Sequence, residues 1–497
     1  MQALHGFEDY WSSAIEFSEA APASSDKISS VTRQWLRTFP AFILALLAGS
    51  VVWSQPAQTK DQLFQSAVSA YESGRYAEAV PPLEKLVRAL PDNFEVHELL
   101  GLVYAAESED AKANDHLAKA VRIKPNDAAA RSNLAASYAR LGKMDLAEEQ
   151  FGKAAELEPD NFDANHNLGE AYVRTGKVAK AIPYLEKAQR IAPASYDNGY
   201  DLSMAYFTAG RLADARSSVE QLLKVKDTAE LHNLLAQIEE KDGNFIAAVN
   251  QFETAAHIEP SESNLFDWAG ELMVHRTLDP AVEVFRQATD RYPNSPRLMV
   301  GLGMAYYARG NYDDAVKALL RGADLSPSDS RVYKFLARAY DSSPAQANEV
   351  IDRFRRFAEL QPHNGQALYY YAMSLWKGKR AQDPEFDPKQ IQALLQRAIA
   401  ADPALAEAHL QLGNLSADQG NFREAIPEYQ RALELNSDLA DGHYRLAQSY
   451  VRTGQKDKAQ EQFQIYQQLR AQHLADLDKQ RADIRQFVYS EKDSAHP

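Results

Sequence analysis

The sequence contains no cysteine among its 497 residues. This absence excludes a disulfide-stabilised scaffold, a thiolate metal centre, a thiol nucleophile and a lipid-modified cysteine. An excess of positive charge is also lacking, because 54 Lys and Arg residues stand against 69 Asp and Glu residues, for a formal net charge of −15. A protein that binds a phosphate backbone needs a basic footprint, so nucleic acid is not an expected partner.

Motifs of catalysis are missing as well. The pairs Gly142-Lys143 and Gly176-Lys177 lack the upstream glycine and the following Ser or Thr of a phosphate-binding loop. No two of the twelve histidines flank a glutamate at the spacing of zinc proteases, and no Gly-x-Ser-x-Gly elbow occurs. We therefore predict no catalytic residue, no cofactor and no metal ion.

Long apolar runs are scarce, and the one that stands out is Phe39 to Trp53. Arg33 and Arg37 precede it, and small residues lead up to Ser54. A positive start, an apolar centre and small residues at the end are the three parts of a secretory signal peptide. The run is short for a membrane-spanning helix, which needs about 20 residues. We predict a signal peptide at residues 31–54 and export to the periplasm or the cell exterior.

Residues 1–30 precede this segment and are acidic and polar. Signal peptides normally start at the initiator residue. We interpret residues 1–30 as an untranslated N-terminal extension, with translation starting near Val31. The alternative is an uncleaved segment, residues 39–53, that anchors the protein to a membrane or is buried as an apolar helix.

The rest of the sequence repeats with a period of 34 residues. In one unit, Ala128 to Asn161, the recurring residues fall at positions 7, 8, 11, 15, 20, 24, 27 and 32: they are Leu134, Ala135, Tyr138, Gly142, Ala147, Phe151, Ala154 and Pro159. Positions 7, 8 and 11 share one face of a first helix, and positions 20, 24 and 27 share one face of a second. Glycine at position 15 suits the end of the first helix, and proline at position 32 stops the second. Each unit is therefore predicted to be an antiparallel helix pair.

These residues closely resemble the tetratricopeptide repeat, whose period and Leu, small, Tyr, Ala, aromatic, Ala and Pro positions are the same. The resemblance covers residues 60–470. It implies an all-α fold, an α-α superhelix (solenoid) of about twelve helix pairs. The pairs are expected to begin near Lys60, Phe94, Ala128, Phe162, Tyr196, Ala229, Glu262, Pro296, Arg331, Gly365, Ala406 and Ala440.

Departures from the pattern fall in the later units. Arg276 replaces the usual glycine, Pro344 lies in a turn, and residues 379–388 form an insertion rich in Asp and Pro, expected to be a surface turn. The last second helix has no stop signal, so residues 471–497 are predicted to form a C-terminal helical cap and tail. The alternative is a projecting coiled coil that dimerises.

The resemblance also implies a concave surface lined by first helices, at repeat positions 2, 5, 9, 12 and 13. In the early repeats this surface is polar and mostly acidic, and the basic clamp that some relatives use to hold carboxylates is absent. Asn133 and Asn167, both at position 6, resemble the inner asparagine ladder of the sugar-transferase relatives, where the amide contacts a peptide backbone.

Aromatic and methionine side chains dominate the same positions in the later repeats. Such side chains anchor apolar segments of partners, although they also pack between neighbouring helices. The predicted partner-binding residues of this zone are Tyr200, Met204, Phe207, Phe266, Met304, Tyr307, Phe335, Tyr369, Met373 and Trp376, with Met273 and Val300 beside them.

The sequence thus favours a non-enzymatic scaffold that binds proteins or extended peptides in its concave groove. The alternative is a recruiting or regulatory subunit of a cell-envelope enzyme complex that handles glycans or polysaccharides. Histidines recur at one repeat position, which indicates packing rather than metal ligation; His97, His232, His409 and His443 are the examples.

Overall fold

The structure is a computed structural model that describes residues 59–343, 346–378 and 387–472. The predicted extension at residues 1–30, the predicted signal peptide at residues 31–54 and most of the insertion lie outside these residues. The same holds for residues 473–497 of the predicted C-terminal cap.

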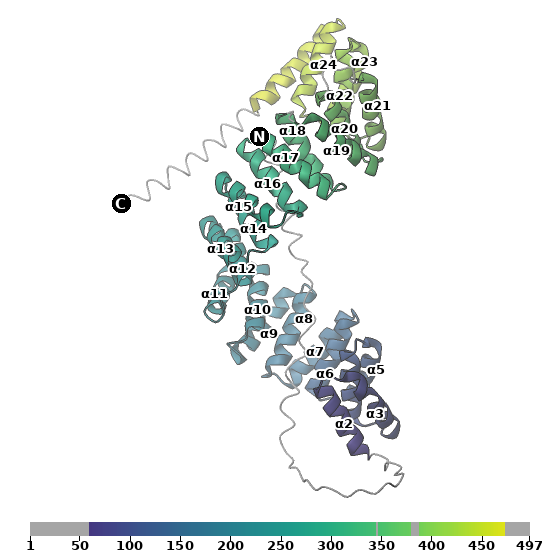
Figure 1. Cartoon of the computed structure of the whole chain (residues 1–497), viewed down its shortest axis with the longest axis vertical. Helices are drawn as coiled ribbons and strands as arrows, with labels where there is room; N and C mark the ends of the chain where they lie inside the picture. Colours follow the sequence, from purple (N-terminus) through teal and green to yellow (C-terminus); the bar gives the residue numbers. More distant parts are fainter. Residues whose placement is uncertain (1–58, 344–345, 379–386, 473–497) are drawn as a thin grey trace, which may run out of the picture. The chain divides into compact units, whose positions relative to one another are not determined.

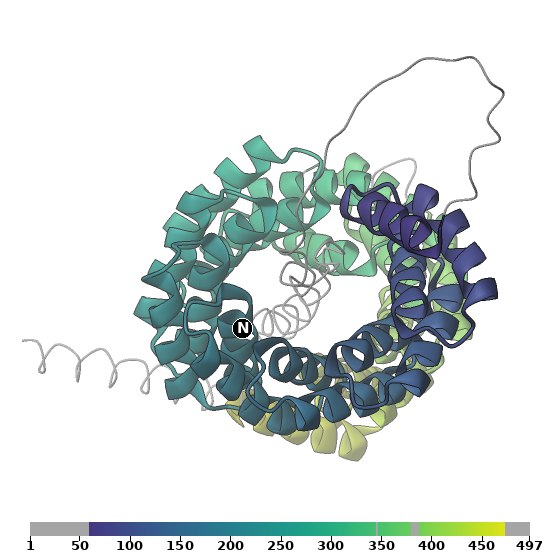
Figure 2. The ribbon, with the colours of Figure 1, turned by 90° about the horizontal axis from the view of Figure 1, so that it is seen from below.

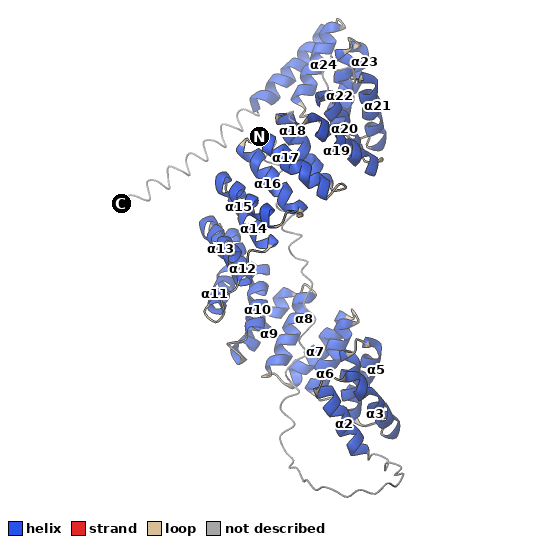
Figure 3. Cartoon of the chain, viewed as in Figure 1, coloured by secondary structure: helices blue, strands red, loops and turns tan. Residues whose placement is uncertain are grey.

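The described residues contain helices and connecting turns, with no strand (Figure 3). The first unit of the chain contains α2 (Lys60–Glu72), α3 (Tyr76–Ala89), α4 (Phe94–Ala106), α5 (Asp110–Ile123), α6 (Ala128–Arg140), α7 (Met144–Leu157), α8 (Phe162–Arg174), α9 (Val178–Ile191), α10 (Tyr196–Thr208), α11 (Leu212–Leu223), α12 (Ala229–Lys241) and α13 (Phe245–Ile258).

The second unit contains α14 (Glu262–Val274), α15 (Leu278–Arg291), α16 (Pro296–Arg309), α17 (Tyr312–Leu325), α18 (Ser330–Ser342), α19 (Ala347–Leu360), α20 (Gly365–Gly378), α21 (Pro388–Ala401), α22 (Ala406–Asp418), α23 (Phe422–Leu435) and α24 (Ala440–Arg452). A further helical segment follows at residues 456–472.

Successive helices pair as the sequence predicts, so that the described part of the chain holds twelve repeats, numbered here from 1 (α2 and α3) to 12 (α24 and residues 456–472) (Figure 1). The all-α solenoid of helix pairs is confirmed. Eleven of the predicted starting residues are the first residues of their helices. The exception is α18, which begins at Ser330 rather than Arg331.

Local sequence signals set the ends of each pair. Asn93, Asp127 and Asn161 precede first helices, and each side chain accepts a hydrogen bond from a backbone N–H of the first turn. After the first helix, Gly176 takes a φ of 71°, in the left-handed region that glycine adopts without steric penalty. Arg276 takes the corresponding conformation, with a φ of 58°, at the place where glycine is missing.

The two helices of a pair lie close together because position 8 is small. A Cβ atom added to Gly169 would lie 2.6 Å from Cγ of Leu185, the position-24 residue of the same repeat. Gly101 and Gly303 face their own position-24 leucines in the same way. The position-20 alanine Ala181 is fully buried at the same interface. Small residues thus allow the large position-24 side chain to pack against the backbone of the first helix.

The pairs form two compact units, which divide between Pro260 and Ser261. Within the first unit, successive first helices contact one another, from α2 to α4 and onward to α12. Figure 2 shows the ribbons of this unit, purple to teal, in an inner and an outer layer. Because neighbours in the inner layer of a curved stack approach more closely, these contacts place the first helices on the concave side of the unit.

Two glycine-to-alanine substitutions test the close approach. Gly169→Ala should destabilise the protein by about 1–3 kcal/mol, since its methyl group would overlap Leu185. Gly152→Ala lies in a helix with no atom within 4 Å of the added Cβ, and should stabilise by up to about 1 kcal/mol. Denaturant unfolding of both variants measures the difference. Equal effects would contradict the predicted packing.

Candidate binding surfaces on the first helices

The concave side of the first unit carries a row of polar and acidic side chains, here called the acidic face. All of its members are half-buried or exposed. The acidic face consists of Glu95, Glu98, Asn133, Asp163, His166, Asn167, Glu170, Asp197, Tyr200, Asp201 and Glu230, from α4, α6, α8, α10 and α12.

The two asparagines of the acidic face differ in their hydrogen bonds. Nδ2 of Asn133 donates to Oε1 of Glu98 at 3.4 Å, which links α6 to α4. Within the described residues, the side-chain amide of Asn167 makes no hydrogen bond. A half-buried amide has two donor hydrogens and an acceptor oxygen, which is the complement of a peptide group. The structure therefore leaves the Asn167 amide available to a ligand.

Two carboxyl groups of the acidic face have perturbed protonation. The pKa of Glu98 is raised to about 7, chiefly by burial and then by the charge of Asp127. The pKa of Asp201 is raised to about 6, again chiefly by burial; the His166 ring, whose Nδ1 lies 3.9 Å from Oδ2 of Asp201, acts in the opposite direction. Both groups lie among other carboxylates and would be stabilised as anions by an added cation.

Few positively charged side chains lie near the acidic face, and one of them already forms an ion pair with it. Nζ of Lys124 lies 2.9 Å from Oε1 of Glu95, and the pKa of Glu95 is lowered mainly by that hydrogen bond. Burial, followed by the charge of Glu230, raises the pKa of the Tyr200 hydroxyl. The acidic face therefore keeps its negative character at neutral pH.

Tyr200, Met204 and Phe207, predicted from sequence as partner-binding residues, lie on α10. All three are half-buried and pack against the hydrophobic core of repeats 4 to 6. Their remaining exposed surface extends the acidic face with an apolar edge.

Three other predicted residues are covered by the chain itself. Phe266, Met304 and Phe335 are 1%, 1% and 7% exposed. The Phe266 ring packs edge-on against Phe285, with the centroids 5.8 Å apart, and the Arg297 guanidinium lies 3.6 Å from its centroid. Side chains this deeply buried belong to the core, so these three are removed from the set of binding residues.

The position of Phe335 follows from the start of α18. Because the helix begins at Ser330, Lys334 takes position 5 and Phe335 moves to position 6. One residue turns a helix by about 100°, so Lys334 takes the place on the face that was predicted for Phe335. Lys334 is exposed instead.

The four remaining predicted residues are half-buried in the second unit, and we call them the aromatic face: Tyr307 on α16, with Tyr369, Met373 and Trp376 on α20. The Tyr369 ring lies 5.9 Å from that of Tyr370, and burial raises the pKa of its hydroxyl. Tyr307 packs against Tyr312 at 5.3 Å. Each keeps part of its apolar surface in contact with solvent.

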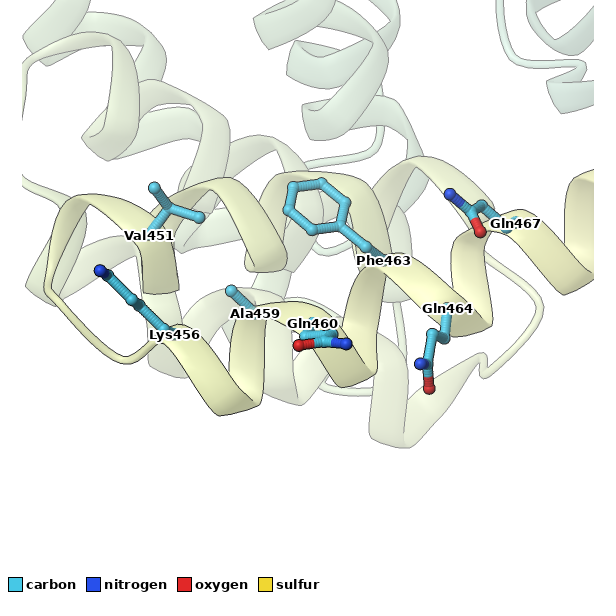
Figure 4. Close-up of a pocket in the computed structure, with 7 residues that line it drawn as sticks. All are labelled: Val451, Lys456, Ala459, Gln460, Phe463, Gln464 and Gln467. Atoms are coloured by element: carbon cyan, nitrogen blue, oxygen red, sulfur yellow. The ribbon is translucent and has the colours of Figure 1, made fainter.

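Sequence reasoning missed one surface, a shallow hollow on the last described helix pair. It is lined by Val451, Lys456, Ala459, Phe463 and Gln467, with two further glutamines (Figure 4). In repeat 11 the equivalent surface is covered by the next first helix, which places Leu446 and Tyr450 against it. Val451 is 52% exposed because no such helix covers it among the described residues.

Neither a metal-binding group nor a membrane-spanning helix is found in the described ranges. There, His, Asp and Glu side chains form no group of three or more that could hold a metal ion. The same ranges include no helix that is both long and apolar enough to cross a bilayer.

Comparison with known families decides the classification. Models of the tetratricopeptide repeat match residues 64–128, 132–196, 176–238 and 277–339, and further models of the repeat match residues 413–454 and 441–473. Together these segments cover more than half of the sequence. The chain belongs to the tetratricopeptide-repeat family.

Individual relatives are distant. The chain is 24% identical over 233 residues to the TPR repeat-containing protein YpiA of Bacillus subtilis, a match that covers 45% of this chain and 51% of that protein. It is 23% identical over 207 residues to the human protein O-mannosyl-transferase TMTC3, across 41% of this chain and 22% of the relative. The chain thus spans about half, or less, of the length of these relatives.

Solved structures of the same repeat are similar at low identity. The structure of Naa15/Naa10 bound to HypK-THB aligns with 82% of this chain and 68% of its own, at 18% identity and a TM-score of 0.36. YrrB, described as a TPR protein with an unusual peptide-binding site, aligns with 38% of this chain and 97% of its own, at 18% identity and a TM-score of 0.32.

Proposed function

We propose that this tetratricopeptide-repeat protein is a non-enzymatic scaffold that binds an extended, basic segment of a partner protein along its acidic face. The available amide of Asn167 is the observation that carries the proposal, because carboxylates surround it on its own helix α8 and on the next first helix, α10. An extended segment leaves its backbone N–H and C=O groups unpaired, and a side-chain amide can bond to both kinds of group.

Charge supports a basic segment in particular. Glu98 and Asp201 are partly desolvated, and neighbouring carboxylates add to the rise in both pKa values. A Lys or Arg side chain placed beside either carboxyl group would relieve the repulsion from its neighbouring carboxylates and form a charge-assisted hydrogen bond. An acidic segment would add to the repulsion, so the same face also discriminates against acidic partners.

The aromatic face is a second proposed contact surface, in the other unit. Tyr and Trp side chains keep both an apolar body and a polar edge, and methionine adapts to irregular shapes. Tyr369, Met373 and Trp376 therefore suit apolar side chains of a partner. A partner that contacts both faces would gain affinity from two sites on one chain.

The alternative function is a recruiting or regulatory subunit of a cell-envelope enzyme that handles glycans. The partial similarity to a protein O-mannosyl-transferase favours retaining this alternative. A protein that is purified from its own cells as a stable complex with an enzyme would support it. A free monomer that binds peptides reversibly would support the scaffold.

Peptide binding tests the acidic face. A fluorescent extended peptide with alternating Lys and Ala residues should bind, and the same peptide with Glu in place of Lys should not. Asn167→Ala should weaken binding about fivefold, the effect of about one hydrogen bond. Asn250→Ala, a substitution on the exposed side of a second helix, is the matched control. Equal affinity of both variants would contradict the assigned role of Asn167.

The affinity for the basic peptide should also depend on pH. Glu98 and Asp201 lose their protons at about 7 and about 6, so the face becomes more negative as the pH rises from 6 to 8. Binding should tighten by about fivefold over that range, as expected for one or two partly exposed charge pairs. The double variant Glu98→Gln, Asp201→Asn should show a flat profile. A wild-type profile that is already flat would refute the dependence on these carboxyl groups.

Export is proposed from the sequence of residues 31–54, where two arginines precede the apolar run. Mass spectrometry of the native protein should then find an N-terminus at residue 55 or residue 51. Substitution of Arg33 and Arg37 by Glu should retain the precursor inside the cell. A native protein that begins at Met1 would rule out cleavage.

A further inference from the structure

A hydrogen bond recurs at the fourth position of the first helices. There the side chain donates to the backbone carbonyl six residues earlier, in the loop that enters the helix. The bond is formed by His97 to Pro91, Arg131 to Pro125, Asn165 to Pro159, Tyr333 to Pro327 and His443 to Ser437, at distances of 2.7–3.0 Å. Different chemical groups therefore serve one purpose, which is to fix the loop to the start of the helix.

In several repeats the position-4 side chain bonds to the second helix of its own pair, nineteen residues later. Arg131 bonds to Gln150, His232 to Gln251, His409 to Glu428 and His443 to Gln462, at 2.6–2.7 Å. Repeat 2 differs, because the residue nineteen positions after His97 is a second histidine. Nδ1 of His97 lies 2.9 Å from Nδ1 of His116. The two rings are stacked, with centroids 5.2 Å apart.

The number of protons that this pair can hold is limited by its geometry. Nε2 of His97 must carry a hydrogen to donate to the Pro91 carbonyl, so in the neutral ring its Nδ1 is an acceptor. Nδ1 of His116 then donates. One added proton is tolerated, because His97 can donate from both nitrogens once His116 changes tautomer. A second proton would place two N–H donors 2.9 Å apart, each facing the other.

We propose that the His97–His116 pair is an acid-sensitive latch that holds repeat 2 together while the pair carries at most one positive charge, and opens when both rings are protonated. The latch joins three parts of the repeat: the loop at Pro91, the first helix α4 and the second helix α5. Its opening would release the start of α4.

The groups that surround the pair have mixed effects. On α5, Asp115 lies next to His116 in sequence, and Lys119 forms an ion pair with Asp92 of the entering loop at 2.7 Å. From α3, Glu84 accepts a hydrogen bond from Tyr104, whose ring stacks on His116.

The remaining neighbours add little charge to the pair. Nζ of Lys112, on α5, lies 5.2 Å from the centroid of the Tyr104 ring, the same ring that stacks on His116. The helix α6 packs on α5 through the apolar side chains of Ala130 and Leu134, and the charge of its Arg140 is balanced by Asp110 of α5, 2.7 Å away. Burial first, and the neighbouring His97 second, lower the pKa of His116 despite the nearby carboxylates.

The direction of the pH effect follows from that lowering. A histidine of an unfolded segment titrates near 6.5. Because the closed latch keeps His116 neutral to a lower pH, the open state binds more protons below about 6.5, and acid shifts the equilibrium toward opening. The carboxyl group of Glu98 acts in the opposite direction, since its raised pKa means that acid stabilises the folded state.

Opening matters to the surface described above. Glu95 and Glu98 lie on α4, so a loosened repeat 2 removes two carboxylates from the acidic face without unfolding the other repeats. The latch itself depends only on His97, His116 and Pro91, and its test does not require that a peptide bind.

Hydrogen exchange of the full chain between pH 7.5 and 5 tests the latch. In the Glu98→Gln variant, which removes the opposing carboxyl group, protection factors of backbone amides in α4 and α5 should fall by up to about tenfold for each pH unit below about 6.5, while those of repeat 12 stay level. His116→Gln, which introduces the partner found in repeats 6 and 12, should abolish this fall in repeat 2.

The converse substitution keeps the test decisive. Gln462→His should transfer the pH dependence to repeat 12, where His443 is the partner. The proposal is overturned if wild type and His116→Gln show the same pH profile in repeat 2. If His116→Gln lowers protection in repeat 2 at every pH, the second variant decides. In that case the proposal is overturned if protection in repeat 12 of the Gln462→His variant does not depend on pH.

Discussion

The contact between position 8 and position 24, as in repeats 2, 4, 8 and 11, is the constraint on which the remaining structure depends. The Leu185 side chain packs directly over the backbone at Gly169, so the two helices of repeat 4 lie closer than ordinary side chains would allow. Tyr429 takes the same place over Gly413. A close pair presents a narrow, regular edge on which the next first helix can pack, and a stack of such edges curves. The acidic face exists because this curvature places successive first helices side by side.

How much of this was predictable varies with the kind of residue. Helix starts follow from Pro, Gly and capping residues that act over a few positions, so the sequence located eleven of twelve. The exception, α18, shows the limit: Asp329 caps the helix from the residue before Ser330, so Lys334 takes position 5, while Phe335 is buried. Phe266 is covered by Phe285 and Arg297, which are distant from it in sequence. The 34-residue repeat pattern does not predict contacts of this kind.

The position-4 residues show a related limit. Their recurrence indicated a structural rather than a metal-binding role, but the partners were not deducible from the repeat pattern. His97, Arg131, Asn165 and Tyr333 have little in common except a donor group long enough to reach the same carbonyl. Consensus matching overlooks such a position, because the requirement concerns hydrogen-bond geometry and several side chains satisfy it. The structure was needed to show that, in repeat 2, two titratable histidine rings make these hydrogen bonds.

Repeat architecture explains why such local differences are tolerated. Each repeat contacts chiefly its neighbours, so a change in one of them alters two interfaces and leaves the others intact. A globular core would couple a buried histidine pair to every surrounding element, and its protonation would threaten the whole domain. In a stack, the same pair can loosen one repeat and the two hydrophobic clusters that it shares with its neighbours, while the cluster of repeats 3 and 4 stays intact. Charge, aromatic content and pH response can therefore differ from repeat to repeat along one surface, and a long array can combine them to recognise a segment that no single repeat could hold.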